Sequence, residues 1–439
     1  MQTTGVRIHG AGDVRMETFE LPKLGAHELL ARVVTDSMCM STYKAVMQGS
    51  AHRCIPDDIA EHPCLIGHEL CAVVEQVGEA LQGQYQVGEV FTAQPKMYRD
   101  GKVVGLGYTF PYYGGDATHI IIPQEAIDGG YLLPYQGKAY YSASVAEPIS
   151  CLVSALRSMY HLKEEGSKEH VMGLKAGGKL AIIVTTKKDA SVDPAFFDNY
   201  LLQITVPFVS GLGCAAVAMA MEPRPSKIVI TDINEARVRR AREVLKPQNG
   251  VELEIVNTAE FEDTAKTLRE RYTGGAGFDD VMIMAPVPSV AETADAVCGT
   301  DSCINFFAGP TRKDFFASIN LYDVHYNDKH LIGTSGGDME DLRIAVRLLE
   351  SGAIDASILL THIGGLDAVG PCVCQLPSIP GGKKLIDCGL RLPLTASDEF
   401  EEKGKQEPLF AALAEICKRH GMLWNAEAEA YLLAHGERM

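Results

Sequence analysis

Three residues that lie far apart in the sequence carry side chains that are typical metal ligands. Cys39 follows a strand-like run in MCMSTYK, His68 lies in a Gly-His-Glu triplet that opens another, and Glu147 precedes a helix-like stretch. One thiolate, one imidazole and one carboxylate, with a fourth position left open, form the donor set of a catalytic zinc. Such a zinc polarises a carbonyl or stabilises an alkoxide, which suits hydride transfer. Taken singly, each residue also fits an ordinary role, as a buried thiol, a core histidine or a carboxylate at a helix N-terminus.

A second pattern is a GxGxxA run formed by Gly211, Gly213 and Ala216, which follows an apolar strand candidate and opens an apolar helix. In such a turn the glycines allow a tight bend and a close approach of backbone N–H groups to a pyrophosphate. About 20 residues later Asp232 ends the run KIVITDI, where its carboxylate is placed to accept ribose hydroxyls and to repel a 2′-phosphate. The pattern predicts a dinucleotide site that prefers NAD(H) to NADP(H), with Arg237 and Arg239 close by.

The secondary structure expected to position these residues differs between two regions of the chain. Residues 1–150 consist of short β-rich segments, such as 28–39 and 69–79, bounded by turn signals. From about residue 178, short apolar runs alternate with helical stretches, which predicts an α/β doubly wound parallel sheet. The runs are 178–184, 227–233, 251–257, 279–286, 303–309 and 330–336. A helix follows residue 338, and the C-terminal tail is charged and helical.

Composition limits the class of protein. The chain has 439 residues, a formal net charge of −17 and 46% hydrophobic residues, which indicates a globular protein and disfavours nucleic acid or an anionic membrane as partner. The twelve cysteines include no CxxC pair, and the first 15 residues are polar and glycine-rich, unlike a secretory signal, so we expect a cytoplasmic protein with reduced thiols. The uncharged stretch 200–221 is long enough to span a bilayer, but its proline, glutamine and glycines favour a buried strand, turn and helix.

Together these features resemble the zinc-dependent medium-chain alcohol dehydrogenase superfamily over essentially the whole chain, and within it the L-sorbose 1-phosphate reductase group. The resemblance implies a GroES-like catalytic domain over residues 1–157, a Rossmann domain over 158–337 and a return to the catalytic domain over 338–439. The motifs that carry it are Cys39 to Ser41, Gly67 to Glu69, the segment 114–123, Glu147-Pro148, the glycine run, Asp232 and the segments 36–53, 304–338 and 376–386.

The resemblance also assigns roles to residues. It implies that Cys39, His68 and Glu147 bind the catalytic zinc and that Glu69 is a nearby carboxylate able to exchange with water at the metal. Ser41 matches the hydroxyl that passes the substrate proton toward the cofactor ribose. Many relatives complete this relay with a histidine five residues after the cysteine, a position held here by Lys44, which either leaves the relay to solvent or meets a substrate phosphate.

Two departures from the superfamily pattern carry expectations of their own. Residues 91–115, where many relatives bind a structural zinc through four cysteines, contain no cysteine, which predicts one zinc per chain. About 20 extra residues, 185–204, stand between the run GKLAIIV and Gly211. Either GKLAIIV is the first sheet strand and an insertion separates it from its turn, or QITVPFV takes that role and GKLAIIV is displaced.

The resulting expectation is an NAD(H)-linked reductase that interconverts a ketose phosphate and a hexitol phosphate, assembled as a homodimer or homotetramer. Because the whole chain is acidic, the substrate phosphate needs local cations, for which Lys44, Arg53, Lys383 and Lys384 are the candidates. One alternative is a zinc polyol or amino-alcohol dehydrogenase that acts on an unphosphorylated substrate. Another is a non-catalytic nucleotide-binding or regulatory protein whose cofactor site the 185–204 segment disrupts.

Overall fold

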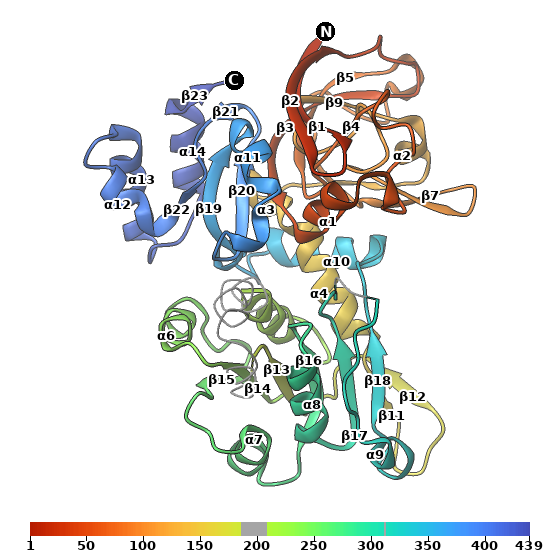
Figure 1. Ribbon diagram of the computed structural model, residues 1–439, viewed down its shortest axis with the longest axis vertical. Coiled ribbons are helices and arrows are strands. Elements are labelled where there is room, and N and C mark those ends of the chain that lie inside the picture. The colour runs from red at the N-terminus through yellow and green to blue at the C-terminus, as the bar shows by residue number, and fades with distance from the viewer. Residues whose placement is uncertain (186–208, 311–312) are drawn as a thin grey trace. The chain divides into compact units, whose positions relative to one another are not determined.

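The computed structural model describes residues 1–185, 209–310 and 313–439 (Figure 1). The chain divides into two compact units, one formed by Met1–Pro148 with Asp338–Met439 and the other by Ile149–Gly337. The first unit therefore gathers the two ends of the sequence, and the second is continuous. Among the described residues, no helix combines the length and apolar character that crossing a bilayer requires.

The first unit is built on β-sheets, as its sequence texture predicts. An eight-stranded sheet has the order β10-β6-β5-β3-β20-β19-β22, with β9 also paired to β3, and a smaller sheet has the order β2-β1-β4. Their strands are β1 (Gln2–Gly10), β2 (Asp13–Glu20), β3 (Leu29–Met38), β4 (Cys64–Leu65), β5 (Cys71–Val77), β6 (Val90–Ala93), β9 (His119–Ile122), β10 (Leu132–Pro134), β19 (Leu360–Gly365), β20 (Lys383–Asp387) and β22 (Thr395–Ala396).

Strand β3 is the centre of this unit, because β5, β9 and β20 all pair with it antiparallel. Its residues are almost all buried, and Leu29, Ala31 and Val33 join one continuous apolar core with Ile386 of β20. The register places Leu385 opposite Ser37 and Lys384 opposite Met38. A segment near the C-terminus thus lies directly beside the residues that precede Cys39.

Short helices and hairpins complete the first unit. The helices are α1 (Met40–Gln48), α2 (Gln124–Asp128), α3 (Tyr140–Ser144), α10 (Met339–Glu350), α11 (Val369–Val373), α12 (Phe400–Lys403), α13 (Pro408–Arg419) and α14 (Ala426–His435), and the small strand pairs are β7 (Lys96–Arg99) with β8 (Lys102–Gly105) and β21 (Leu390–Arg391) with β23 (Glu437–Arg438). Helix α4 (Ala146–Ser158) begins in this unit and continues into the second.

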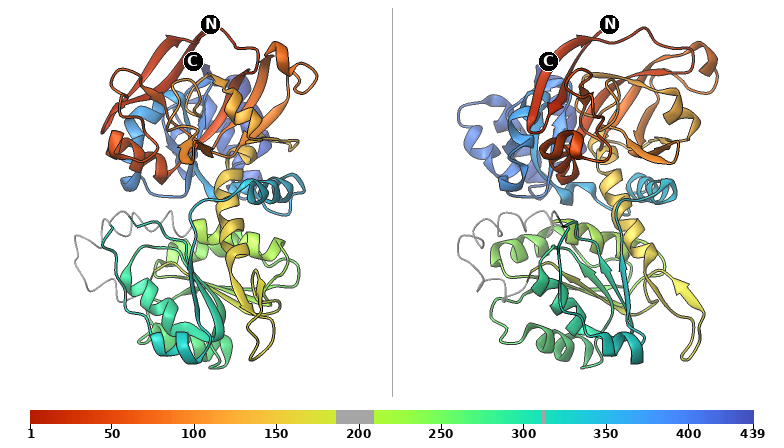
Figure 2. Two further views of the ribbon diagram at one scale, coloured as in Figure 1. Left: turned by 90° about the vertical axis from the view of Figure 1, so that its right-hand side faces the viewer. Right: turned by 45° about the vertical axis from the view of Figure 1, so that its right-hand side comes forward.

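The second unit is the doubly wound parallel sheet that the alternation of runs predicts (Figures 1 and 2). Its six strands have the order β15-β14-β13-β16-β17-β18, and every pair is parallel. In chain order this is 3-2-1-4-5-6, the arrangement of a dinucleotide-binding sheet with its switch point between β13 and β16. The strands are β13 (Lys179–Ile183), β14 (Lys227–Asp232), β15 (Glu252–Asn257), β16 (Phe278–Ile283), β17 (Cys298–Phe306) and β18 (His330–Gly333).

Helices α6 (Glu235–Val244), α7 (Thr264–Thr273), α8 (Pro288–Val297) and α9 (Leu321–Tyr326) connect these strands, and β11 (Tyr160–Leu162) forms a hairpin with β12 (His170–Met172). Asparagine or aspartate begins several of them by accepting a backbone N–H, as Asn234 does at the start of α6 with Arg237. The run GKLAIIV forms β13, the first strand of this sheet in chain order. Of the two alternatives that the sequence left open, this is the one in which GKLAIIV is the first sheet strand. The segment 186–208 lies outside the described residues.

Candidate metal and cofactor sites

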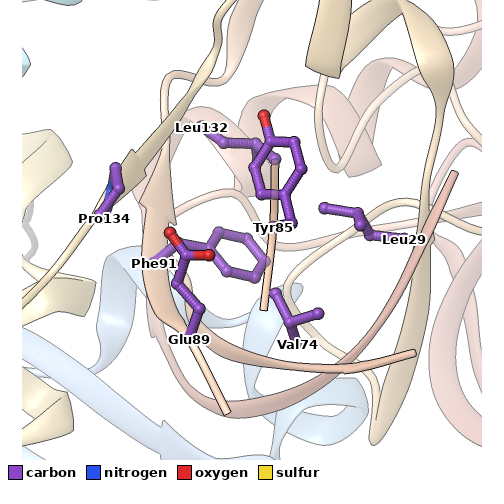
Figure 3. Close-up of a pocket in the computed structure, with 7 residues that line it drawn as sticks. All are labelled: Leu29, Val74, Tyr85, Glu89, Phe91, Leu132 and Pro134. Atoms are coloured by element: carbon purple, nitrogen blue, oxygen red, sulfur yellow. The ribbon is translucent and has the colours of Figure 1, made fainter. Parts of the chain in front are cut away.

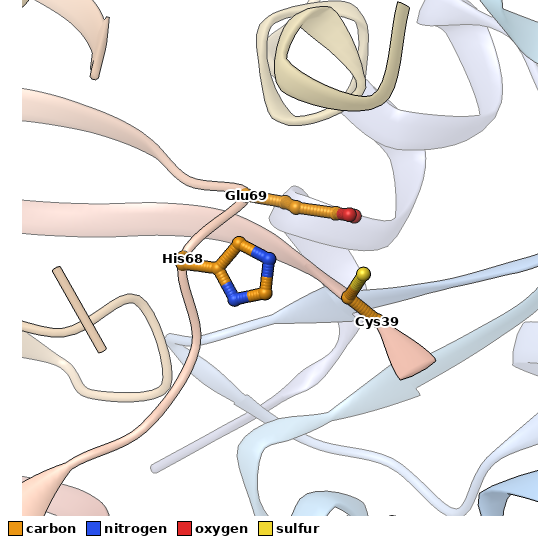
Figure 4. A group of neighbouring side chains, drawn as sticks. All are labelled: Cys39, His68 and Glu69. Atoms are coloured by element: carbon orange, nitrogen blue, oxygen red, sulfur yellow. The ribbon is translucent and has the colours of Figure 1, made fainter. Parts of the chain in front are cut away.

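Cys39, His68 and Glu69 converge where strand β3 ends (Figure 4). Cys39 is the N-cap of α1, with extended backbone, and His68 and Glu69 lie in the connection that leads into β5. The peptide N–H of Ser37 donates to the carbonyl of Glu69 at 3.2 Å, which ties this connection to β3. Pairing of β3 with β5 therefore brings the two sequence motifs together.

Gly67 makes this connection possible. Its φ of +86° belongs to the left-handed region, and a Cβ there would lie 2.5 Å from the backbone nitrogen of Asp116. A larger residue would push the connection away from the loop that contains Asp116, and His68 and Glu69 would move with it. The glycine of the Gly-His-Glu triplet is thus explained by a close approach of two backbones.

The donor atoms of Cys39, His68 and Glu69 all lie within 4.8 Å of one another, and no other group of three such donors occurs in the part of the chain that the structure describes. His68 and Glu69 are buried, and Cys39 is half-buried. A thiol, an imidazole and a carboxylate at this spacing are the ligands that zinc prefers, so the residues present fit a zinc ion.

Glu147, the third ligand that the resemblance implies, lies outside this group of three. It stands in the first turn of α4 and is 8% exposed. Its negative charge acts on Cys39, on Tyr108 and on Lys383, which brings it into the same electrostatic environment. Its role as a ligand remains a proposal.

Hydroxyl groups surround the imidazole of His68. Thr42 Oγ1 lies 3.0 Å from Nδ1, and the Tyr108 hydroxyl lies 3.1 Å from the same nitrogen. Ser41 Oγ lies 3.3 Å from Nε2 and 2.9 Å from the sulfur of Cys39. A metal-ligating histidine usually has its second nitrogen held by such a group, which fixes the ring. The sequence analysis singled out neither Thr42 nor Tyr108. Thr42 could have been found from its position, three residues after the ligand candidate Cys39.

The charge of Lys383 balances the acidic side of the site. Its ammonium pairs with Glu69 Oε1, and Ser37 donates its hydroxyl to Glu69 Oε2. Although burial opposes a charged lysine, the negative charges of Cys39, Glu69 and Glu147 raise the pKa of Lys383. Burial, together with the charge of Glu69, raises the pKa of the Cys39 thiol to about 11. A cation bound between these donors would favour the thiolate that a zinc ligand must be.

The four residues proposed to bind the substrate phosphate differ in exposure and in their contacts. Arg53 is exposed, and Lys44 on α1 is half-buried. Lys383 is engaged with Glu69, and Lys384 is 1% exposed with its ammonium donating to the carbonyls of Ile379 at 3.2 Å and Gly382 at 2.7 Å. Both lysines on β20 are therefore internal contacts rather than surface cations, because pairing with β3 places them inside the unit.

The predicted cofactor residues also take specific places. Residues 209–220 are helical, so Gly211, Gly213 and Ala216 lie within a helix and not in the turn that the GxGxxA pattern predicts. The missing side chain of Gly211 serves packing instead, since a Cβ there would lie 3.3 Å from Ile182 Cγ2 and 3.4 Å from Val184 Cγ2. The connection between β13 and this helix falls largely outside the described residues.

Asp232 ends β14, as predicted, and is fully buried. Arg237 donates to its two oxygens at 2.9 and 2.7 Å, and the backbone N–H of Asn234 donates at 2.8 Å. Such a bidentate pair holds the carboxylate in one orientation. A ribose hydroxyl would therefore meet a carboxylate that already shares its charge with the guanidinium of Arg237, one of the two arginines that the sequence places close by.

A hollow elsewhere in the first unit is unrelated to these residues. Its volume of about 210 Å³ includes space open to solvent, and it is lined by Leu29, Val74, Tyr85, Glu89, Phe91, Leu132 and Pro134 (Figure 3). Its lining is apolar except for the Glu89 carboxylate and the Tyr85 hydroxyl, and it contains none of the donor residues. It provides no chemistry for a reaction.

Comparison with known proteins agrees with this geometry. Residues 25–127 match the alcohol dehydrogenase GroES-like domain. The chain is 41% identical to mannitol-1-phosphate 5-dehydrogenase of Aliivibrio fischeri, over 98% of this chain and 97% of that protein. It is 37% identical to L-sorbose 1-phosphate reductase of Klebsiella pneumoniae, over 99% and 98% of the two chains.

Among solved structures, 2R,3R-butanediol dehydrogenase from Bacillus subtilis has the same fold, with a TM-score of 0.67 and 20% identity over 88% of this chain and 99% of that one. The two sequence relatives cover nearly the whole chain at more than a third identity, which is sufficient to assign a family. The chain therefore belongs to the zinc-dependent medium-chain alcohol dehydrogenase superfamily, in the group that contains the mannitol-1-phosphate and L-sorbose 1-phosphate enzymes.

Proposed function

We propose that this chain is a zinc-dependent, NAD(H)-linked oxidoreductase that interconverts a ketose phosphate and a hexitol phosphate. The observation that carries the proposal is the convergence of Cys39, His68 and Glu69 around Ser41, on a chain related over its full length to two enzymes named for phosphorylated sugars or polyols. Cys39, His68 and Glu147 would hold the zinc, with Glu69 beside it. When bound, zinc supplies a Lewis acid for the substrate oxygen and NADH supplies the hydride.

We assign the transfer of the substrate proton to Ser41. Its Oγ lies 2.9 Å from the sulfur of Cys39 and 3.3 Å from Nε2 of His68, so it borders the position where these donors meet. During reduction Ser41 Oγ gives a proton to the substrate oxygen, and during oxidation it takes one. Lys44 stands one turn further along α1 and either connects this hydroxyl to solvent or binds the substrate phosphate.

The phosphate end of the substrate needs a cation because the chain carries a net charge of −17. Of the four candidate cations, Arg53 is exposed and Lys44 is half-buried on α1, whereas Lys383 pairs with Glu69 and Lys384 is buried. Arg53 follows η1 (Gly49–Ala51), shortly after α1, and is exposed to an incoming anion. A guanidinium suits this task because it binds phosphate through two hydrogen bonds.

The residues at the end of β14 would decide whether the chain prefers NAD(H) or NADP(H). The Asp232 carboxylate would repel a 2′-phosphate, which favours NAD(H), whereas Arg237 beside it offers that phosphate a cation. We expect NAD(H) to be preferred, with a larger kcat/KM for NADH than for NADPH. Replacing Asp232 with asparagine should reduce that ratio.

A substrate panel tests the proposal. The zinc-loaded protein is assayed with sorbose 1-phosphate and fructose 6-phosphate plus NADH, and with free sorbitol plus NAD⁺. A phosphate contact worth about 1.5–3 kcal/mol gives a phosphorylated substrate roughly a 10- to 150-fold larger kcat/KM than its unphosphorylated counterpart. A preference for free sorbitol would instead favour a polyol dehydrogenase. Absence of any NADH binding, measured by nicotinamide fluorescence, would favour a non-catalytic protein.

A cysteine substitution tests the metal part separately. Cys39→Ala should lose both zinc and turnover, because the thiolate ligand is gone. Cys372→Ala is the matched control, since Cys372 is also a half-buried free thiol but lies outside the donor group, and it should keep both. Full activity of the Cys39→Ala protein would rule out the zinc mechanism.

A further inference from the structure

The Glu69 carboxylate is held by contacts to both of its oxygens. Lys383 pairs with Oε1 and Ser37 donates to Oε2, while the backbone N–H of Glu69 donates to Asp36 Oδ1 at 2.9 Å. The side chain of Glu69 is completely buried. Its carboxylate is thus fixed within 4.8 Å of the Cys39 and His68 donor atoms, and each of its oxygens already has a protein partner.

Lys383 reaches this position through the sheet. It begins β20, which pairs antiparallel with β3 so that Leu385 lies opposite Ser37. Its side chain is 16% exposed. The adjacent Lys384 has a different task, because its ammonium donates to backbone carbonyls, including Gly382 at 2.7 Å. Two neighbouring lysines of the same strand therefore provide a residue that contacts the site and a buried control that does not.

Charge bookkeeping gives Lys383 a specific role. With Cys39 as thiolate, Glu69 and Glu147 as carboxylates and His68 neutral, the donors carry three negative charges, and a divalent ion leaves one uncompensated. The ammonium of Lys383 cancels it. An uncompensated carboxylate next to a metal that has an open position is itself a candidate ligand, since zinc readily binds carboxylate oxygen.

We propose that Lys383 is a positioning residue that holds Glu69 off the metal and so keeps the fourth coordination position open for the substrate. This inference rests on the zinc site of the proposed function. It predicts that removing the Lys383 ammonium changes metal retention and substrate turnover in opposite directions. Without the ammonium, Glu69 becomes a fourth protein ligand, so the metal is held more tightly while substrate turnover falls. A lysine that only stabilised the fold would, when removed, loosen the metal and lower the melting temperature.

The test measures metal retention on the full chain. Wild-type, K383M, K383R and E69Q proteins are loaded with Zn²⁺, and metal release to an excess of chelator is followed. We expect about tenfold tighter retention in K383M than in wild type, in the range that metal-site supporting residues produce, together with a lower kcat. K383R keeps the charge and should behave like wild type. Loading with Co²⁺ adds a spectroscopic readout, because an extra carboxylate ligand changes the visible absorption.

The K383M/E69Q double variant isolates the mechanism. If Lys383 acts through Glu69, removing the carboxylate abolishes the extra retention, and the double variant holds metal no more tightly than E69Q alone. K384M is the matched control, which should melt at a lower temperature without gaining retention. If K383M does not fold, K383Q carries the same prediction.

Two results would overturn the inference: metal release from K383M that is as fast as or faster than from wild type, or a double variant that retains metal as tightly as K383M. These readouts need no substrate. Failure of the sugar phosphate panel with the retention pattern intact would therefore reject the proposed substrate and not the role of Lys383. A folded wild-type chain that binds no zinc would reject both.

Discussion

The orientation of the His68 ring depends on single hydroxyl groups, of which Thr42 Oγ1 at 3.0 Å from Nδ1 is buried and close. Thr42→Val keeps the side-chain shape and removes this partner, so the ring loses part of the support that fixes it for the metal. We expect zinc affinity to fall by about tenfold, measured by competition with a chelator. Thr42→Ser retains the hydroxyl and should bind zinc like wild type. Unchanged affinity in Thr42→Val would mean that Tyr108 alone holds the ring.

Single residues also mark the limit of what the sequence can predict. Cys39 and His68 were identified from the sequence because few residue types bind zinc, whereas Glu69 was named only through the family resemblance and the predicted third ligand, Glu147, lies outside the group of three. Lys383 was named as a phosphate candidate because a phosphate substrate of an acidic chain needs a local cation. Its pairing with Glu69 depends on the register between β20 and β3, which cannot be predicted from a local sequence pattern.

At the scale of elements, helix α14 supplies a cap that α3 lacks. The N-cap of α3, Ala139, makes no side-chain hydrogen bond, and Glu429 of α14 accepts the N–H groups of Tyr140 at 2.8 Å and Tyr141 at 2.6 Å. Burial raises the pKa of Glu429 to about 7, more than these donors lower it. The C-terminal helices are thereby fixed to the strand-rich part of the first unit through a titrating group.

This contact predicts a pH dependence of stability. Because the folded state binds the Glu429 proton more tightly than the unfolded state, whose ordinary pKa is 4.5, the associated stabilisation is complete below that pH and is lost as pH rises through about 7. In E429Q the side chain at position 429 no longer titrates, so the unfolding free energy of wild type relative to E429Q should fall by up to about 3 kcal/mol between pH 4.5 and 7. Denaturant unfolding at several pH values measures this, and a constant difference would contradict it.

Among the predicted elements, the strands were interpreted correctly and the glycine-rich turn was not. The strands β13 to β18 follow the predicted apolar runs, because buried parallel strands read as continuous hydrophobic segments. The GxGxxA run was interpreted as a turn, yet Gly211 lies in a helix and packs on Ile182 and Val184. Small residues serve both tight turns and close helix–sheet packing, so composition alone does not distinguish the two.

At the scale of the whole molecule, the cysteines predict the metal content. All twelve are free thiols, one of them belongs to the donor group described above, and residues 91–115 contain none. We expect one zinc per chain by elemental analysis of the metal-loaded protein, and none in Cys39→Ala. The denatured protein should react with a thiol reagent at twelve positions without prior reduction, because no pair is oxidised. Two zinc ions per chain would show that donors other than cysteine clusters build a second site, and fewer than twelve reactive thiols would show that some of the buried cysteines form disulfides.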